Sequence, residues 1–187
     1  MTDDPDKATL RRRLRAGRSA HRASLGPDGI AAATRALTDR LLPLLVRTAM
    51  VGGYVPHRGE ADVLPVLLET HRRGSGLALP RTDGGGRMRF VGWHPDAALG
   101  PGFAGIGEPA EAAEVVPGLL LVPLVGFDRA GRRLGQGAGC YDRWLAAHPG
   151  GRAIGVGWSV QEVAALAPDP WDVALDMIVT EAETIVP

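Results

Sequence analysis

Apolar residues along the chain predict a series of buried strands. Residues 119–125 form a continuously apolar run, which is typical of a strand buried on both faces of a parallel sheet. Shorter apolar runs bounded by turn residues predict further strands. These shorter runs cover residues 49–55, 77–79, 87–93, 153–158 and 178–180.

Helical periodicity occupies the stretches between the predicted strands. Leu10 and Leu14 lie one turn apart among arginines, so residues 7–22 are expected to form a helix with a narrow apolar stripe. Gly26 and Pro27 interrupt this pattern. Further helices are expected over residues 30–46, 60–73 and 141–147.

The alternation of strands and helices predicts one domain of the α/β class over residues 1–187. We expect a three-layer, Rossmann-like arrangement with a largely parallel central sheet. In such sheets, ligands bind outside the carboxyl ends of the strands. The segments that follow the predicted strands are therefore the places to look for a site.

Composition narrows the class of protein. No apolar run approaches the roughly 18 residues that a membrane-spanning helix needs, and the charged N-terminus lacks the apolar core of a signal peptide. The single cysteine, Cys140, cannot form an internal disulfide, which fits a reducing compartment. These features predict a soluble cytoplasmic protein with no membrane partner.

Basic residues are almost all arginine. Formal net charge is zero, and no aromatic residues interleave with the N-terminal run of arginines, so a solvated helix face is favoured over a nucleic-acid surface. That run consists of Arg11, Arg12, Arg13, Arg15 and Arg18. Lys7 is the only lysine among 21 basic residues. Two interpretations stay open: a compact ammonium is needed there, or the lysine is a chance survivor near the terminus.

The strongest chemical signal is the segment VPLVGFDRAGRRLGQGAGCYDRWLAA, residues 122–147. A predicted buried strand leads into spaced glycines and then into a helix start. Glycines let backbone N–H groups approach an anion, and a helix start adds unpaired donors and a positive dipole end. Arg132 and Arg133 could add charge, and Asp142 could hold a magnesium ion. We therefore interpret the segment as a phosphate-binding loop rather than a surface turn.

Two familiar nucleotide motifs do not fit this loop. It contains no GxxxxGK[ST], so it is not a Walker A loop. The third glycine of a dinucleotide fingerprint would fall at Cys140, and no acidic residue ends the next predicted strand. A nucleotide-binding oxidoreductase is therefore disfavoured.

The stretch FDRAGRRLGQGAGCYDR resembles the signature of the 5-formyltetrahydrofolate cyclo-ligase family, also called methenyltetrahydrofolate synthetases. KATLR resembles the opening helix of that family, and GYVPHRGEAD resembles its folate segment. ALPR, FAGIGEP and DVALDMIVTE follow in the family's order. The resemblance covers nearly the whole chain, with Cys140 standing where the motif usually has a tyrosine.

The resemblance implies roles for particular residues. Lys7, Arg11 and Arg133 are expected to be the catalytic cations. ATP is expected to contact these three and the loop residues Leu134, Gly135, Gln136, Gly137, Ala138, Gly139, Cys140 and Tyr141. The reduced folate is expected to contact Tyr54, Glu60, Gln136 and Cys140. Asp142 and Asp172 are the expected magnesium ligands.

The implied reaction closes 5-formyltetrahydrofolate to 5,10-methenyltetrahydrofolate with ATP and Mg²⁺, releasing ADP and phosphate. Phosphorylation of the formyl oxygen would give an N5-iminium phosphate, which N10 then attacks. A monomer or homodimer is expected. The alternative is a nucleotide-binding regulatory module of the same fold that lacks turnover.

Overall fold

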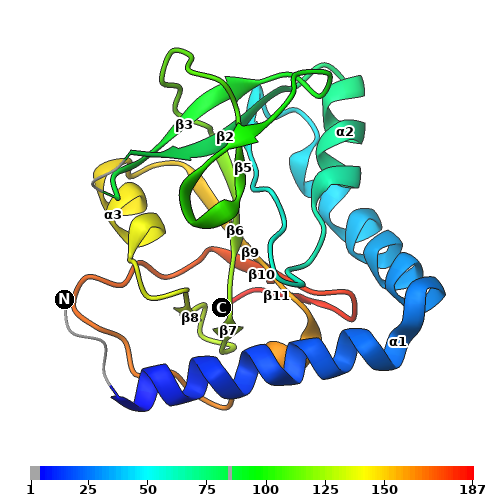
Figure 1. The fold of residues 1–187 in the computed structure, drawn as a ribbon, viewed down its shortest axis with the longest axis vertical. Helices are drawn as coiled ribbons and strands as arrows, with labels where there is room; N and C mark the ends of the chain where they lie inside the picture. The colour runs from blue at the N-terminus through cyan, green and yellow to red at the C-terminus, as the bar shows by residue number, and fades with distance from the viewer. Residues whose placement is uncertain (1–4, 84–85) are drawn as a thin grey trace.

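A seven-stranded sheet forms the centre of the computed structural model, which describes residues 5–83 and 86–187 (Figure 1). Its strand order is β11-β10-β9-β6-β1-β2-β3. The bounds are β1 Met50–Gly52, β2 Gly76–Thr82, β3 Met88–Trp93, β6 Leu119–Pro123, β9 Arg152–Val156, β10 Met177–Val179 and β11 Thr184–Ile185.

Strand pairing confirms the largely parallel sheet. β10, β9, β6, β1 and β2 pair in parallel, while β3 and β11 add antiparallel edges. From β1 the chain builds outward to β2, and from β6 it builds the other way through β9 and β10. The order therefore reverses between β1 and β6. Such a reversal is the place where doubly wound sheets bind ligands.

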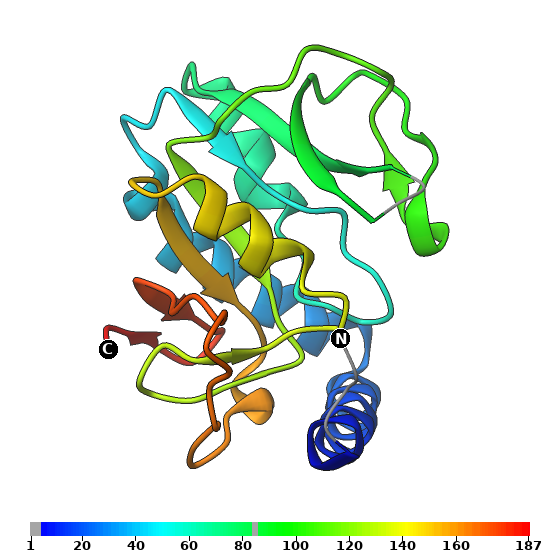
Figure 2. The same ribbon diagram turned by 90° about the vertical axis from the view of Figure 1, so that its left-hand side faces the viewer.

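Two apolar layers sandwich the sheet and confirm the three-layer prediction. In β6, Leu119 and Leu121 enter the core that contains α1 and α2 residues, whereas Leu120 and Val122 enter the core that contains α3 residues. A strand with both faces covered must be apolar at every position, which explains the continuous run. Figure 2 shows α3 in front of the sheet and α2 behind it. The helices are α1 Pro5–Leu45, α2 Leu64–Arg72 and α3 Cys140–Ala147.

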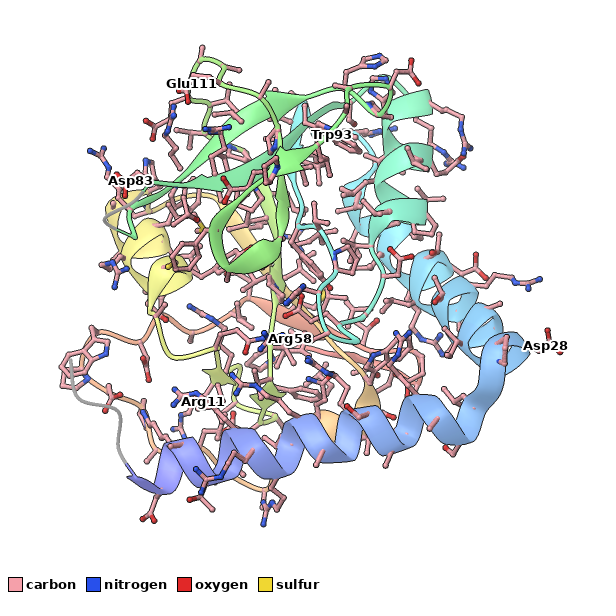
Figure 3. All side chains as sticks on the ribbon, in the orientation of Figure 1. Arg11, Asp28, Arg58, Asp83, Trp93 and Glu111 are labelled. Atoms are coloured by element: carbon pink, nitrogen blue, oxygen red, sulfur yellow. The ribbon has the colours of Figure 1, made fainter. Side chains whose placement is uncertain are left out.

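The predicted break near Gly26 is a bend inside one long helix rather than a loop between two. Gly26 has φ 63° and ψ −179°, and helical backbone resumes directly at Pro27. The two halves of α1 meet at this bend, close to Asp28 in Figure 3. The N-terminal half crosses the carboxyl-end side of the sheet, and the C-terminal half packs Leu37, Leu41 and Leu45 into the core (Figure 1).

Several boundaries differ from the sequence-based predictions. The predicted strand 49–55 ends at Gly52, and the helix expected from residue 60 begins at Leu64, just before a proline at position 65. Residues 53–63 are instead extended chain with one turn. Periodicity cannot separate a polar turn from the first turn of a helix, because both expose polar residues. This correction places Tyr54 and Glu60 on a loop.

Short elements went unpredicted because two or three residues carry no periodicity. They are β11, the pairs β4 (Gly100–Pro101) with β5 (Gly107–Glu108) and β7 (Gly126–Phe127) with β8 (Arg133–Leu134), and the 3₁₀ turns Phe103–Gly105 and Ser159–Gln161. The β7–β8 hairpin presents the glycine-rich loop, and the β4–β5 hairpin stands beside the large cavity described below. Within the described residues, no helix combines the length and apolarity needed to cross a membrane.

Candidate active site

A large cavity of about 390 Å³ lies where the strand order reverses. Val55, just after β1, and Pro123, at the end of β6, both line it. Further walls come from β2, β3, the 57–60 turn, the β4–β5 hairpin, the start of α3 and the glycine loop, which we define as residues 131–139. The topology therefore places the predicted phosphate loop beside a ligand-sized space.

A small cavity of about 300 Å³ lies on the other side of Arg133. Lys7 from α1, Arg132 and Asp172 line it. Arg133 lines both cavities. The side chain of this arginine is 3% exposed, so it forms a wall between the two spaces.

Backbone geometry in the glycine loop requires glycine at its turning points. Gly131, Gly137 and Gly139 have φ values of 76°, 109° and 64°, in the left-handed region that other residues rarely adopt. Gly139 is the residue immediately before α3, and no side chain in the described part of the protein caps that helix start. The first N–H groups of α3 are therefore unused by a cap and can hold an anion.

Asp128 organises the base of the loop, a role that the sequence pattern did not single out. It is buried, and its Oδ1 accepts hydrogen bonds from the N–H groups of Ala130 and Arg132. Its Oδ2 accepts the N–H of Leu166 at 2.9 Å. One carboxylate thus joins the β7–β8 hairpin to the later segment 166–174.

Helix α1 supports the loop from below with two arginines. Arg11 Nε donates to the carbonyl of Gly135 at 2.8 Å, and a β-carbon on Gly137 would lie 3.6 Å from the Arg11 guanidinium carbon. Arg15 donates to the side-chain oxygen of Gln136. Figure 3 shows Arg11 on the N-terminal half of α1. Arg11 therefore packs against the glycine loop, and its expected contact with ATP stays a prediction.

Lys7 lies next to two carboxylates. Its Nζ is 2.6 Å from Asp169 Oδ2 and 3.7 Å from Asp172 Oδ2. Asp172 Oδ2 also accepts the N–H of Asp169 at 2.8 Å. The structure thus brings the predicted Lys7 and Asp172 together in the small cavity, and it adds Asp169, which the sequence analysis did not name.

Arg133 and Asp142 form a buried pair. Arg133 Nη2 donates to Asp142 Oδ1, and Nη1 donates to the carbonyl of Val173 at 2.6 Å. Burial lowers the pKa of Arg133, while the charges of Asp142 and Asp172 act in the opposite direction. The guanidinium thus ties the loop, α3 and the segment 166–174 together.

The two predicted magnesium ligands flank Arg133 from opposite sides. Asp142 lines the large cavity and Asp172 the small one. The hydrogen bonds described for Asp142 and Asp172 engage one oxygen of each, Oδ1 and Oδ2 respectively. Within residues 5–83 and 86–187 no group of three or more His, Cys, Asp or Glu could hold a metal ion. Two carboxylates suit Mg²⁺ that takes its other ligands from phosphates and water.

Glu60 reaches the large cavity from a strained turn. Arg58 and Gly59 have φ values of 48° and 83°, and the N–H of Glu60 donates to the carbonyl of His57 at 3.1 Å. Two successive positive φ values describe a type I′ turn, which costs about 1–2 kcal/mol at a non-glycine residue. The Glu60 side chain is 8% exposed within a cavity wall.

The Glu60 carboxylate is held on both oxygens. Oε2 accepts the N–H of His57 at 3.0 Å, and Oε1 accepts a hydrogen bond from the Gln136 amide at 3.0 Å. Gln136 belongs to the glycine loop, so the expected folate contact and the expected phosphate loop touch directly. His57 also lines the large cavity, and its Nε2 is buried without a hydrogen-bond partner among the described residues.

Tyr54 does not line the large cavity. It is 3% exposed, and its hydroxyl donates to the carbonyl of Ala61 at 2.7 Å. Burial raises the pKa of Tyr54 well above its ordinary value, so the phenol stays protonated as a donor. In this structure Tyr54 acts on the loop that carries Glu60, and the predicted contact with substrate stays a prediction.

Cys140 lines the large cavity at the start of α3. Burial raises the pKa of its thiol, an effect that Arg143 opposes. A protonated thiol is a poor nucleophile. Its position is that of a small wall residue, and the neighbouring Tyr141 and Gly139 line the same space.

Comparison with known proteins finds relatives that match nearly the whole chain. A model of the 5-formyltetrahydrofolate cyclo-ligase family matches residues 3–181. The 5-formyltetrahydrofolate cyclo-ligase of Escherichia coli is 31% identical over 183 residues, covering 93% of this chain and 97% of that protein. The protein of the same name from Mycolicibacterium smegmatis is 31% identical over 162 residues, covering 81% and 83%.

Solved structures extend the agreement to the fold. The 5,10-methenyltetrahydrofolate synthetase of Aquifex aeolicus superposes with a TM-score of 0.81 at 32% identity, covering 96% of this chain and 92% of that one. The synthetase of Mycoplasma pneumoniae has a TM-score of 0.75 at 24% identity, covering 94% and 99%, and supports the fold alone. The chain belongs to the 5-formyltetrahydrofolate cyclo-ligase family.

Proposed function

We propose that this protein converts 5-formyltetrahydrofolate to 5,10-methenyltetrahydrofolate, using ATP and Mg²⁺ and releasing ADP and phosphate. The observation that carries the proposal is the contact between Glu60 and Gln136 at the wall of one cavity. It joins the carboxylate expected at the folate to the loop expected at the phosphates. A ring closure driven by phosphoryl transfer needs both substrates at one place.

The large cavity has the chemistry of a folate site. Met88, Pro80 and Phe103 supply apolar surface for a flat ring, while Glu60 supplies a fixed acceptor. A carboxylate that already holds its orientation can accept the N–H groups of a pterin without rearranging. The unpartnered Nε2 of His57 is a further polar group that a ligand in this cavity could satisfy.

Phosphates of ATP would bind at the glycine loop and the start of α3. The N–H groups there have no side-chain cap, and the dipole of the helix favours an anion. Lys7 and Arg133 would add positive charge from the two sides of the small cavity, and Arg11 would hold the loop through Gly135. Phosphoryl transfer depends mainly on such positioning and charge neutralisation.

In the proposed reaction, the formyl oxygen attacks the γ-phosphorus, and the bond to the β-phosphate oxygen breaks to release ADP. The N5-iminium carbon then carries a phosphate leaving group. N10 attacks that carbon, loses its proton, and phosphate departs with the C–O bond electrons. Arg133 would neutralise charge on the transferred group, and Glu60 would keep the folate aligned for both steps.

Asp142 and Asp172 would hold Mg²⁺ together with the phosphates. When bound, the ion would neutralise phosphate charge during transfer. Both carboxylates lie close enough to Arg133 for their charges to raise its pKa, and they line the two cavities that Arg133 separates.

A turnover assay tests the proposal. Purified protein is mixed with 5-formyltetrahydrofolate, ATP and Mg²⁺, and the near-ultraviolet absorbance of the methenyl product is followed. We expect product only when all three are present, and we expect chelation of the metal to abolish it. Folded protein that binds ATP and folate without forming product would overturn the enzyme assignment and favour the regulatory module.

A further inference from the structure

Arg18 is a buried arginine of α1 that lines neither cavity. The residue is 2% exposed, and its Nη2 donates to the carbonyl of Arg58 at 2.9 Å. Nε and Nη1 are buried and have no hydrogen-bond partner within the residues that the structure describes. Burial lowers the pKa of this guanidinium, and the charge of Glu60 opposes that effect.

Stability does not explain such a residue. A buried cation with two unsatisfied donors is less favourable than an apolar side chain of similar length. None of the described carboxylates forms an ion pair with Arg18, although the charge of Glu60 raises its pKa. Among the described residues, its one hydrogen bond goes to the carbonyl of Arg58 in the strained turn, which points to a role there.

The 57–60 turn needs external support. Arg58 adopts a φ of 48°, and non-glycine residues persist in this region only when their surroundings hold them. Arg18 donates to the carbonyl of Arg58, and Trp158 Nε1 donates to the carbonyl of Gly59 at 3.0 Å. Donors from two distant elements thus hold the carbonyls of both central residues of the turn.

Glu60 follows directly after these two residues, so its direction depends on their backbone angles. If the turn relaxed toward negative φ, the carboxylate would leave both His57 N–H and Gln136. We propose that Arg18 is a positioning residue, which holds the 57–60 turn in the conformation that presents Glu60 to the folate. This inference rests on the proposed function.

Arg18→Met tests the inference because methionine is long, unbranched and apolar, and fills the space without donors. We expect KM for 5-formyltetrahydrofolate to rise about tenfold or more, since small misplacements of positioned groups are costly, while KM for ATP changes by less than about twofold. The melting temperature should equal or exceed that of wild type. Arg13→Met, at an exposed position of the same helix, should match wild type throughout.

A double-mutant cycle shows whether Arg18 acts through Glu60. In a Glu60→Gln background, adding Arg18→Met should change the folate KM by less than about twofold, because the interaction it supports is already lost. The inference is overturned if the fold-changes in folate KM of the two single variants multiply in the double variant. It is also overturned if Arg18→Met alone leaves the folate KM unchanged. Arg18→Lys keeps a charge and a donor, and should recover most of the folate KM even if Arg18→Met folds poorly; failure to recover also overturns it.

The two proposals fail in different ways. Wild-type protein without turnover overturns the proposed function and the role of Arg18 with it. If the wild type is active and the Arg18→Met variant has the same folate KM, only the positioning role is overturned.

Discussion

Lys7 places its ammonium group next to two carboxylates, and this position bears on why a lysine occurs here. Its ammonium lies 2.6 Å from Asp169 and 3.7 Å from Asp172, in the wall of the small cavity. A lysine places a point charge on a flexible stem, whereas an arginine spreads its charge over a planar fork. In a chain whose other basic residues are arginine, this location supports the interpretation that a compact ammonium is needed.

Lys7→Arg preserves charge and therefore isolates geometry. We expect kcat/KM for ATP to fall about tenfold or more, equivalent to about 1.4 kcal/mol of transition-state stabilisation, because the longer guanidinium displaces the charge. Steady-state kinetics at saturating folate measure this change in kcat/KM for ATP. Arg12→Lys is the matched control, since Arg12 is exposed and donates a hydrogen bond to Thr9 in the same helix. Equal, near-wild-type activity in both variants would show that the protein does not require a lysine at position 7.

At the scale of elements, α1 serves two functions on either side of its bend. The half before Gly26 carries Lys7, Arg11 and Arg18, while the half after it is anchored in the core. Because Gly26 has φ 63° and ψ −179°, it occupies a region that is essentially restricted to glycine. The bend therefore sets where the N-terminal half crosses the site.

Two glycines of α1 make a matched pair for testing this. A β-carbon would meet nothing within 4 Å at either Gly17 or Gly26, so only backbone conformation differs. Gly17→Ala should stabilise the protein by about 0.5–1 kcal/mol, because alanine loses less entropy in a helix. Gly26→Ala should destabilise it by about 1–3 kcal/mol through backbone strain. Denaturant unfolding measures both, and equal shifts would show that the bend is not enforced by Gly26.

Long elements were predictable and short ones were not, for physical reasons. The run that became β6 is apolar at every position because both faces of that strand are covered. β7 and β8 have two residues each, so their pairing depends on Asp128 and the loop rather than on periodicity. Glu60 was assigned to a helix because a type I′ turn with arginine at its centre has no strong sequence signal.

The same limit applies to the site. Arg11, Arg133 and the loop glycines could be predicted because one short motif and one helix hold them. Arg15 and Arg18 were assigned to a solvated face, yet the fold places Arg15 on Gln136 and buries Arg18 against the 57–60 turn. Which face of α1 meets the loops depends on the bend and the sheet, and no local pattern records it.

At the scale of the whole molecule, the site joins segments from both ends of the chain. Arg133 bonds to Asp142 in α3 and to the carbonyl of Val173, while Asp128 bonds to Leu166. The segment 166–174 has no helix or strand of its own. Its place beside the small cavity therefore depends on contacts with the β7–β8 hairpin and α3, among them the donation from Arg132 to the carbonyl of Leu166, together with the contact of Lys7 with Asp169.

Arg133→Met should therefore destabilise the fold in addition to removing a positive charge from the site. It leaves the Asp142 carboxylate, itself 19% exposed, without its guanidinium, and removes the donor to Val173. Loss of one partner from a buried pair costs about 3 kcal/mol. We expect denaturant unfolding to show that loss, and limited proteolysis to cut within residues 166–174 faster than in wild type.

Arg129 provides a control that separates the effect of burial on stability from the effect of the number of hydrogen bonds. It donates to both Glu162 and Glu183, but it is 57% exposed, and exposed ion pairs gain little over water. Arg129→Met should leave the unfolding midpoint and the proteolysis rate close to wild type. If Arg129→Met proved as damaging as Arg133→Met, burial would not be what distinguishes the Arg133 pair. The expected difference instead assigns the larger effect on stability to the buried guanidinium of Arg133, which also forms the wall between the two cavities.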